Sequence, residues 1–228
     1  MTISNIKASL REESIKSKKR NTIYYKIGKG DYAEHDRFLG VTVPFLRKLA
    51  KEYEDLSLSE VQELIESPIN EERLFALIIL VNQYKKSPRD EIFDFYLSNI
   101  EYINNWNLVD ASAHLIIGAH LYNADRSLLV ELAKSDIMWE RRIAIVSSWY
   151  FIRKNDLDWT YKIAKLLFAD AHDLIHKATG WMLREAGKRD EKRLRKFLDQ
   201  YHAKIPRTML RYSIEKFDEE IRKSYLFR

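Results

Sequence analysis

The sequence predicts an all-α fold: an α-solenoid, or α–α superhelix, made of stacked helical pairs. Two observations predict it. Only 6 Gly and 4 Pro occur in 228 residues, whereas all-β folds spend many of both on their turns. In addition, similar apolar segments recur every 34 to 36 residues, a period that is typical of helical-pair repeats. We expect a single repeat domain over residues 1–228.

The repeat is visible when four segments are aligned, namely ERLFALIIL, NLVDASAHL, RRIAIVSSW and HKATGWMLR. Ala76, Asp110, Ala144 and Gly180 then share one position, with separations of 34, 34 and 36 residues. Three of these four residues are small, which suits close approach between helices. A fifth segment, PRTMLRYSIEKF, follows about 30 residues later. The alternative is an irregular helical bundle whose spacing is coincidental.

The individual helices are expected along most of the chain. The first covers 4–20, and a loop over 20–40 follows, which holds three of the six glycines and has room for one short helical piece. Thr42 and Pro44 then open a new helix, with Thr as the cap and Pro in the first turn. Further helices are expected at about 44–53, 58–66, 70–86, 88–99, 105–121, 125–134, 138–153, 157–168, 172–186, 190–200 and 205–217.

The net charge of +5 is unevenly distributed. The segment Lys177–Arg228 holds 15 Lys and Arg against 8 Asp and Glu. A second basic cluster near the N-terminus consists of Lys16, Lys18, Lys19 and Arg20. Clustered basic charge favours polyanions, because binding releases their condensed counterions. The alternative is a solvated helix face without a partner.

Several classes of site are excluded or disfavoured. The chain has no Cys, so disulfides, thiolate zinc sites and Cys nucleophiles are excluded. His172 and His176 have helical i,i+4 spacing but no third ligand at motif spacing, so we expect no metal there and a structural or surface role for both. The segment Gly28–Gly30 lacks the pattern of a phosphate-binding loop. The N-terminus has no continuous apolar stretch, and apolar runs such as Leu74–Val81 are too short to span a bilayer, so we expect a cytoplasmic protein without membrane contact.

Asp110 is the exception within the repeat, because a carboxylate on an inner helix face must be hydrated, paired or functional. Trp106 precedes it by four residues, so both side chains project from one face of the helix. Two structural alternatives stay open for Asp110: a buried pair with Arg142, or a bond to a neighbouring helix end. If Trp181 lies on the same concave face, two indoles and a carboxylate would form a cation-binding cleft.

Four stretches carry a resemblance to a known family. They are Asp36-Arg37-Phe38-Leu39-Gly40-Val41 with Val43-Pro44 and Leu46-Arg47-Lys48; Trp106-Asn107-Leu108-Val109-Asp110; Trp139-Glu140-Arg141-Arg142-Ile143-Ala144; and Lys177-Ala178-Thr179-Gly180-Trp181-Met182-Leu183-Arg184-Glu185. In this order and spacing, the chain resembles the AlkD family of DNA glycosylases with HEAT-like repeats, from about Tyr24 to Phe217.

The resemblance implies a role for particular residues. Asp110 matches the family's catalytic Asp, and Trp106 and Trp181 match its two cleft tryptophans. Arg142 matches an arginine that contacts the DNA backbone, and Arg184 and Lys177 are expected to hold phosphates as well. A cleft tyrosine in the glycine-bearing loop corresponds to Tyr32, with Tyr24 or Tyr25 as alternatives.

The resemblance also implies an activity. Relatives excise purines alkylated at N3 or N7 from double-stranded DNA without flipping the lesion out of the helix and without a cofactor, and we expect a monomer. Some relatives lack the catalytic Asp and only bind DNA. A DNA-structure-binding protein without catalysis, a helical scaffold that binds proteins, and an RNA-directed protein are the alternatives.

Overall fold

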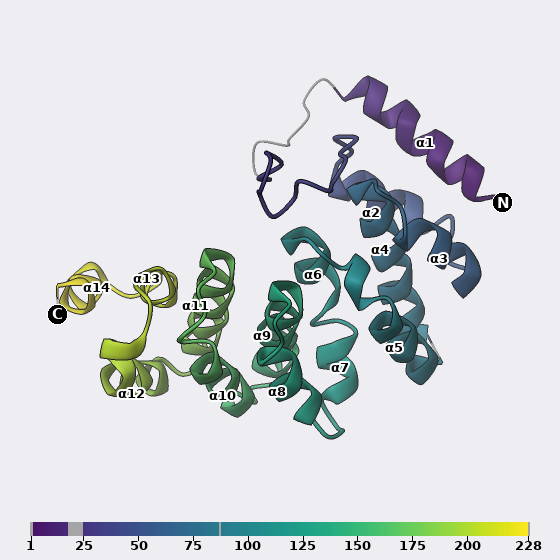
Figure 1. Ribbon diagram of the computed structural model, residues 1–228. Helices are drawn as coiled ribbons and strands as arrows, with labels where there is room; N and C mark the ends of the chain where they lie inside the picture. Colours follow the sequence, from purple (N-terminus) through teal and green to yellow (C-terminus); the bar gives the residue numbers. More distant parts are fainter. Residues whose placement is uncertain (1, 18–24, 87, 228) are drawn as a thin grey trace. The chain divides into compact units, whose positions relative to one another are not determined.

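The computed structural model describes residues 2–17, 25–86 and 88–227 (Figure 1). These residues form helices, turns and loops, and the only β-type pairing among them is an isolated bridge between Arg37 and Ile69. The prediction of an all-α helical-repeat fold is therefore confirmed. The chain divides into two compact units, Met1–Ser112 and Ala113–Arg228, which are described separately below.

The first unit is organised around one apolar helix, α4. The helices of this unit are α1 (Ile3–Lys16), α2 (Val43–Ala50), α3 (Leu58–Ile65), α4 (Asn70–Lys86), α5 (Arg89–Ser98) and α6 (Trp106–Ser112), with a 3-10 helix at Ile100–Tyr102. Helices α2, α3, α5 and α6 all pack against α4. Every residue from Asn70 to Val81 is buried. The run LFALIILV, residues 74–81, has no polar face to present to water.

Local sequence explains where helices of this unit begin. Ser57 caps α3 with a capping box, in which its side chain accepts from the backbone N–H of Glu60 while the Glu60 carboxylate accepts from the N–H of Ser57. Helix α2 begins at Val43, with Thr42 as its N-cap and Pro44 in its first turn. The predicted start at Thr42 and Pro44 is therefore confirmed, although the Thr42 side chain makes no capping hydrogen bond.

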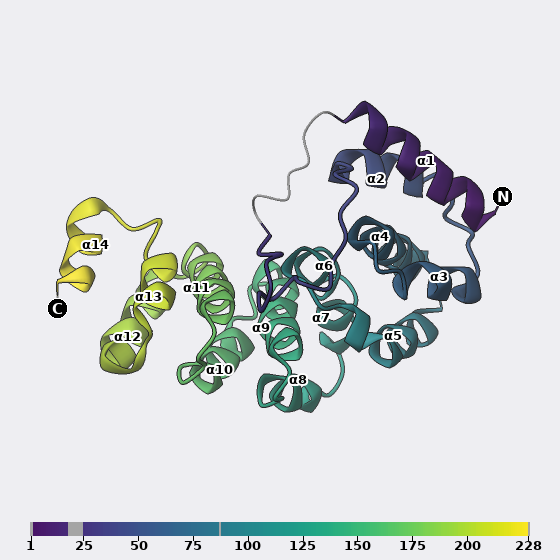
Figure 2. The same ribbon diagram turned by 45° about the horizontal axis from the view of Figure 1, so that its top comes forward.

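The second unit is a stack of helical pairs in two layers. The helices are α7 (Ile117–Leu121), α8 (Ser127–Ala133), α9 (Met138–Arg153), α10 (Asp158–Leu166), α11 (Asp173–Gly187), α12 (Glu191–Tyr201), α13 (Arg207–Ser213) and α14 (Glu219–Leu226), with a 3-10 helix at His202–Lys204. Helices α9, α11 and α13 form one layer and α8, α10 and α12 the other, as the row of green and yellow helices in Figure 1 shows. Figure 2 shows the same order from a second direction.

Two glycines let helices of the second unit approach closely. A Cβ atom built on Gly180 of α11 would lie 2.5 Å from the carbonyl oxygen of Met209 in α13. A Cβ atom on Gly118 of α7 would lie 2.2 Å from the carbonyl oxygen of Ser147 in α9. Neither distance leaves room for a methyl group, so the small residue expected at the Gly180 repeat position is required by the packing of α11 on α13.

Some expected boundaries are wrong. The helix predicted over 105–121 is two helices, α6 and α7, separated by a turn at 113–116. The N–H of Gly118 donates to the carbonyl of Ala113 at 2.9 Å, five residues back along the chain, whereas an α-helical bond spans four. Such a widened turn requires neither Gly nor Pro, so no residue in the sequence indicates it. The helix predicted over 205–217 ends at Ser213, and α14 follows without having been predicted. The first helix ends at Lys16, and the basic residues 18–20 lie outside the described residues.

Candidate functional site

Helix α6 presents the two residues that the sequence singled out in the first unit. Trp106 is its first residue and Asp110 lies four residues later, and both are half-buried. A rise of 1.5 Å per residue places them about 6 Å apart along the axis, one turn from each other. The predicted arrangement of an indole and a carboxylate on one face of a short helix is consistent with these positions.

Polar side chains fix the beginning of α6. The side-chain N–H of Asn105, which precedes the helix, donates to the buried carboxylate of Asp36. Asp36 also pairs with Arg73 of α4, and the side chains of Asn70 and Asn107 bond to each other, with a distance of 2.6 Å from Nδ2 of Asn107 to Oδ1 of Asn70. A seven-residue helix has little stability of its own, so these bonds determine where Trp106 and Asp110 lie.

An aromatic stack covers Trp106. The Tyr25 ring lies against the Trp106 indole, with ring centroids 5.1 Å apart and planes inclined by 15°. Phe38 packs on Tyr25 in turn, at 4.3 Å. Burial raises the pKa of Tyr25, and the nearby carboxylates of Glu71 and Asp36 raise it further, so its hydroxyl is neutral at physiological pH.

Tyr25 is thus the loop tyrosine that contacts Trp106, one of the alternatives that the sequence left open. Tyr24 lies outside the described residues. Tyr32 is half-buried in the same loop and is not among the residues that line the pocket described next, so its place in a DNA-binding cleft stays a prediction. The loop has no periodic pattern, and for that reason the sequence alone could not show which of its tyrosines contacts Trp106.

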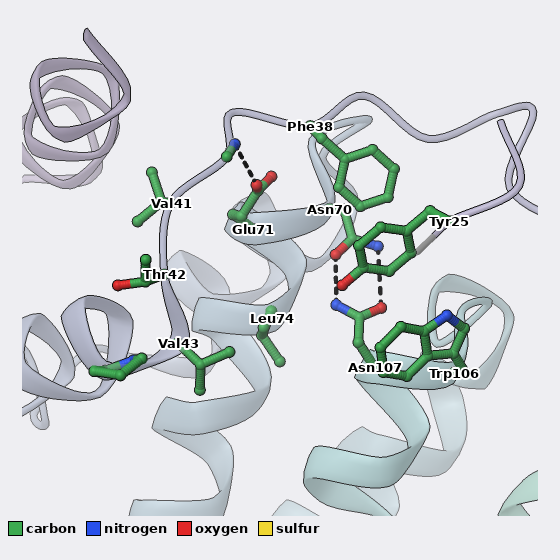
Figure 3. Close-up of a pocket in the computed structure, with 12 residues that line it drawn as sticks. Tyr25, Phe38, Val41, Thr42, Val43, Asn70, Glu71, Leu74, Trp106 and Asn107 are labelled. Carbon is green, nitrogen blue, oxygen red and sulfur yellow. Dashed lines mark hydrogen bonds between the residues drawn. The ribbon is translucent and has the colours of Figure 1, made fainter. Parts of the chain in front are cut away.

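A pocket of about 280 Å³ adjoins Trp106 (Figure 3). Its walls come from the loop before α2 and from the starts of α2, α4 and α6. In Figure 3 the Tyr25 hydroxyl points toward the space in front of Leu74. The lining residues are Tyr25, Phe38, Gly40, Val41, Thr42, Val43, Pro44, Asn70, Glu71, Leu74, Trp106 and Asn107. Sequence reasoning missed Glu71 and Asn70, because polar residues at a helix start are ordinary capping residues.

Glu71 is the buried carboxylate of this pocket. Its oxygens accept from the backbone N–H groups of Leu39 at 3.0 Å and Gly40 at 2.7 Å. Burial raises the pKa of Glu71, although the backbone N–H groups around the carboxylate oppose that rise. The carboxylate therefore holds the loop before α2 in place and leaves the pocket with negative or neutral character.

In the second unit, Trp181 packs in an aromatic row that the sequence did not reveal. Its indole lies edge-on to that of Trp149 in α9, with centroids 4.9 Å apart. His114 also packs against Trp149, at 4.5 Å, and the guanidinium of Arg153 lies over the Trp149 ring at 5.4 Å. Trp181 itself is half-buried, so part of its indole is accessible.

The predicted DNA-contacting residues of this unit differ in exposure. Arg142 is only 5% exposed, and its Nη1 donates to the carbonyl oxygen of Leu174 at 2.7 Å. Arg184 pairs with Glu215 and with its neighbour Glu185. Lys177 is more exposed and pairs with the residue one turn before it, Asp173, at 2.7 Å.

The two histidines with i,i+4 spacing have structural partners. Nδ1 of His172 accepts from the N–H of Leu174 and so caps α11. Nε2 of His176 bonds to the carbonyl of Asp170 at 2.6 Å. Within residues 2–17, 25–86 and 88–227, no group of three or more His, Asp and Glu side chains is arranged to hold a metal ion. In the same part of the chain, no helix is both long and apolar enough to cross a membrane.

The fold and the α6 residues define the chain as a helical-repeat protein in which a carboxylate lies one helical turn after a stacked tryptophan. A family model described as "DNA alkylation repair enzyme" matches residues 6–217. The chain therefore belongs to the family of DNA alkylation repair enzymes, which gives it a role in the repair of alkylated DNA. The family resemblance inferred from the sequence is confirmed.

A solved structure shares the fold. It is described as "Predicted DNA alkylation repair enzyme from Enterococcus faecalis", and it matches this chain with a TM-score of 0.67 at 17% sequence identity. The match covers 87% of this chain and 93% of that one. No curated protein matches the chain.

Proposed function

We propose that this protein is a DNA glycosylase that releases N3- or N7-alkylated purines from double-stranded DNA, as the first step of base excision repair. The observation that supports it most is the carboxylate of Asp110, one turn after Trp106 on a helix whose start is tied down by side-chain bonds. Membership of the family of DNA alkylation repair enzymes supports the substrate class.

Asp110 is proposed to act on the sugar. Alkylation at N3 or N7 makes a purine cationic, so its glycosidic bond is already weak and the leaving base needs little acid assistance. As the bond breaks, positive charge develops on the deoxyribose, and a fixed carboxylate in a partly dry environment stabilises that charge. The same carboxylate would orient the water that attacks the sugar carbon.

Trp106 and Trp181 are proposed to contact the deoxyribose beside the lesion. An indole face attracts a positively charged sugar and excludes bulk water from it. Contact with the sugar does not require extrusion of the base, so we propose that the lesion stays in the helix during cleavage, unlike the substrates of base-flipping glycosylases. For Trp181 the proposal rests on the family resemblance and on the accessible part of its indole.

Basic residues are proposed to hold the DNA by its phosphates, with no reading of base edges. Arg142, Arg184 and Lys177 are the candidates in the second unit, and Tyr32 is the candidate in the loop of the first. The bond from Arg142 to the carbonyl of Leu174 holds its guanidinium in one orientation, which suits a residue that positions a backbone. We propose that the protein acts as a monomer.

The decisive experiment compares wild type with Asp110→Asn on duplex DNA that carries 7-methylguanine or 3-methyladenine. We expect base release to slow by about 100-fold or more, the size of effect seen when a preorganised charge-stabilising group is lost. The affinity for DNA should be unchanged, because the replacement keeps the shape of the side chain. Asp94→Asn, at an exposed position of α5, is the matched control and should release bases at the wild-type rate.

Either of two results would count against the assignment. Base release by Asp110→Asn at the wild-type rate would mean that Asp110 is structural. Tight DNA binding by wild type without any base release would identify the protein as a DNA-structure-binding member of the family.

A further inference from the structure

The pocket beside Trp106 has a chemistry that the reaction at the sugar does not use. Its lining combines apolar side chains with a buried carboxylate and two amides, those of Glu71, Asn70 and Asn107. No Lys or Arg belongs to the lining in the described part of the chain. Asp110 does not line it either. The pocket adjoins the turn of α6 that carries Trp106, about 6 Å along the helix axis from Asp110.

The charge of this pocket disfavours a phosphate. Among the described residues, no basic side chain lines the pocket to balance the Glu71 carboxylate, and the charge of Glu71 helps to raise the pKa of Tyr25. An anion would therefore be repelled here. Each carboxylate oxygen can accept more than one hydrogen bond, so Glu71 can still accept from a ligand's N–H groups after it has bonded to the backbone N–H groups of Leu39 and Gly40. The fitting ligand is small, neutral and flat, with N–H donors on its edge and apolar faces.

The proposed reaction produces such a molecule. When water attacks the sugar carbon, its oxygen forms the new C–O bond and the electron pair of the broken C–N bond stays on the purine nitrogen. That pair cancels the positive charge of the alkylated ring, and the proton of the water passes to the carboxylate or to solvent. The released base is thus neutral, and guanine and adenine derivatives both carry an exocyclic amino group that donates hydrogen bonds.

We propose that this pocket holds the alkylpurine base after its release, with the exocyclic amino group donating to Glu71. This inference rests on the proposed glycosylase function and adds a site for the leaving base. A base that stays stacked in the helix until cleavage reaches the pocket only as product. The site should therefore show itself as an affinity for the free base and as product inhibition of turnover by added base.

The test uses the whole protein and two free bases, 7-methylguanine and 3-methyladenine, in calorimetric titrations. Val43→Phe and Leu74→Phe each add a bulky ring to the pocket lining, from α2 and from α4, and Figure 3 shows both side chains. Leu166→Phe is the matched control, because Leu166 lies outside the lining residues and is 39% exposed, as is Val43. Circular dichroism checks that each variant folds. If either Val43→Phe or Leu74→Phe fails to fold, the other still tests the pocket.

We expect wild type and Leu166→Phe to bind both bases equally well, and Val43→Phe and Leu74→Phe to bind them at least about tenfold more weakly. Added 7-methylguanine should slow multiple turnover of wild type. Equal affinity in all folded variants, or no binding of either base by wild type, would overturn the inference. If wild type releases bases from DNA but does not bind free base, the proposed function stands and the assignment of the pocket is wrong. If wild type binds free base but releases none from DNA, the proposed function is wrong, and the pocket is then not a product site.

Discussion

Removal of the Asp36 carboxylate should destabilise the first unit strongly. Asp36 is buried, and it accepts hydrogen bonds from Arg73, from Asn105 and, at 3.0 Å, from Asn70. In Asp36→Ala, the guanidinium of Arg73, which is 3% exposed, would lose the charge that balances it. The N–H groups of the two asparagines would lose an acceptor as well, and a buried donor without a partner is itself unfavourable.

The magnitude follows from the burial of the pair. Removal of one partner of a buried ion pair lowers the free energy of unfolding by about 3–5 kcal/mol. For a chain of this size, each kcal/mol shifts the melting temperature by about 2–4 °C, so the expected loss is about 6–20 °C. Melting is followed by far-ultraviolet circular dichroism, which reports the helix content of the chain.

Two further variants make the reasoning refutable. Arg37→Ala, an exposed neighbour, should change the free energy of unfolding by no more than about 0.5 kcal/mol. The double variant Asp36→Ala with Arg73→Met removes both charges. Its loss in the free energy of unfolding should therefore be smaller than the sum of the losses of Asp36→Ala and Arg73→Met alone. Strictly additive effects would show that the two side chains are not coupled, and the argument from an unbalanced buried charge would then be wrong.

Two other variants test the packing and the buried carboxylate. Gly180→Ala should lower the free energy of unfolding by about 1–3 kcal/mol, since its Cβ would strike the backbone of Met209, whereas Gly187→Ala would meet only the movable end of a leucine side chain; equal thermal stability of the two variants would contradict this. Because burial raises the pKa of Glu71 above its ordinary value of 4.5, the native state holds that proton more tightly than the unfolded chain. This contribution to stability is present at low pH and is lost as pH rises through the raised pKa. The free energy of unfolding of wild type minus that of Glu71→Gln should therefore fall with rising pH in denaturant titrations, and a constant difference would refute it.

The sequence predicted the parts of the fold that depend on local rules. Apolar periodicity indicated the positions of most helices, and the Thr42–Pro44 signal located the start of α2. The turn at 113–116 carries neither Gly nor Pro, and for that reason it could not be separated from the helices on either side. The signals of α14 were present, because Asp218 precedes two glutamates in the order of a helix start, but the segment is so polar that Tyr225 is its one buried residue.

Only the part of the candidate site that lies on helix α6 could be predicted from the sequence. Trp106 and Asp110 are four residues apart, and helical geometry alone places them on one face. The contact between Tyr25 and Trp106 depends on the course of a loop, which is held by its own Asp36 through bonds to α4 and to Asn105, and by Glu71 of α4. Neither carboxylate differs in sequence from an ordinary surface residue. Their importance follows from burial, which only the folded chain reveals.

The bonds around Asp36 also explain how a short helix can present a working carboxylate. Asp36 belongs to the loop that carries Tyr25, Arg73 and Asn70 belong to α4, and Asn105 immediately precedes α6. One buried carboxylate therefore connects the loop tyrosine with the helix of Trp106 and Asp110. Since α6 has only seven residues, its orientation is set by these bonds more than by its own hydrogen bonds. It follows that a conservative change at Asp36 should reduce base release even where the protein still folds, while Asp110→Asn should reduce release without loss of stability.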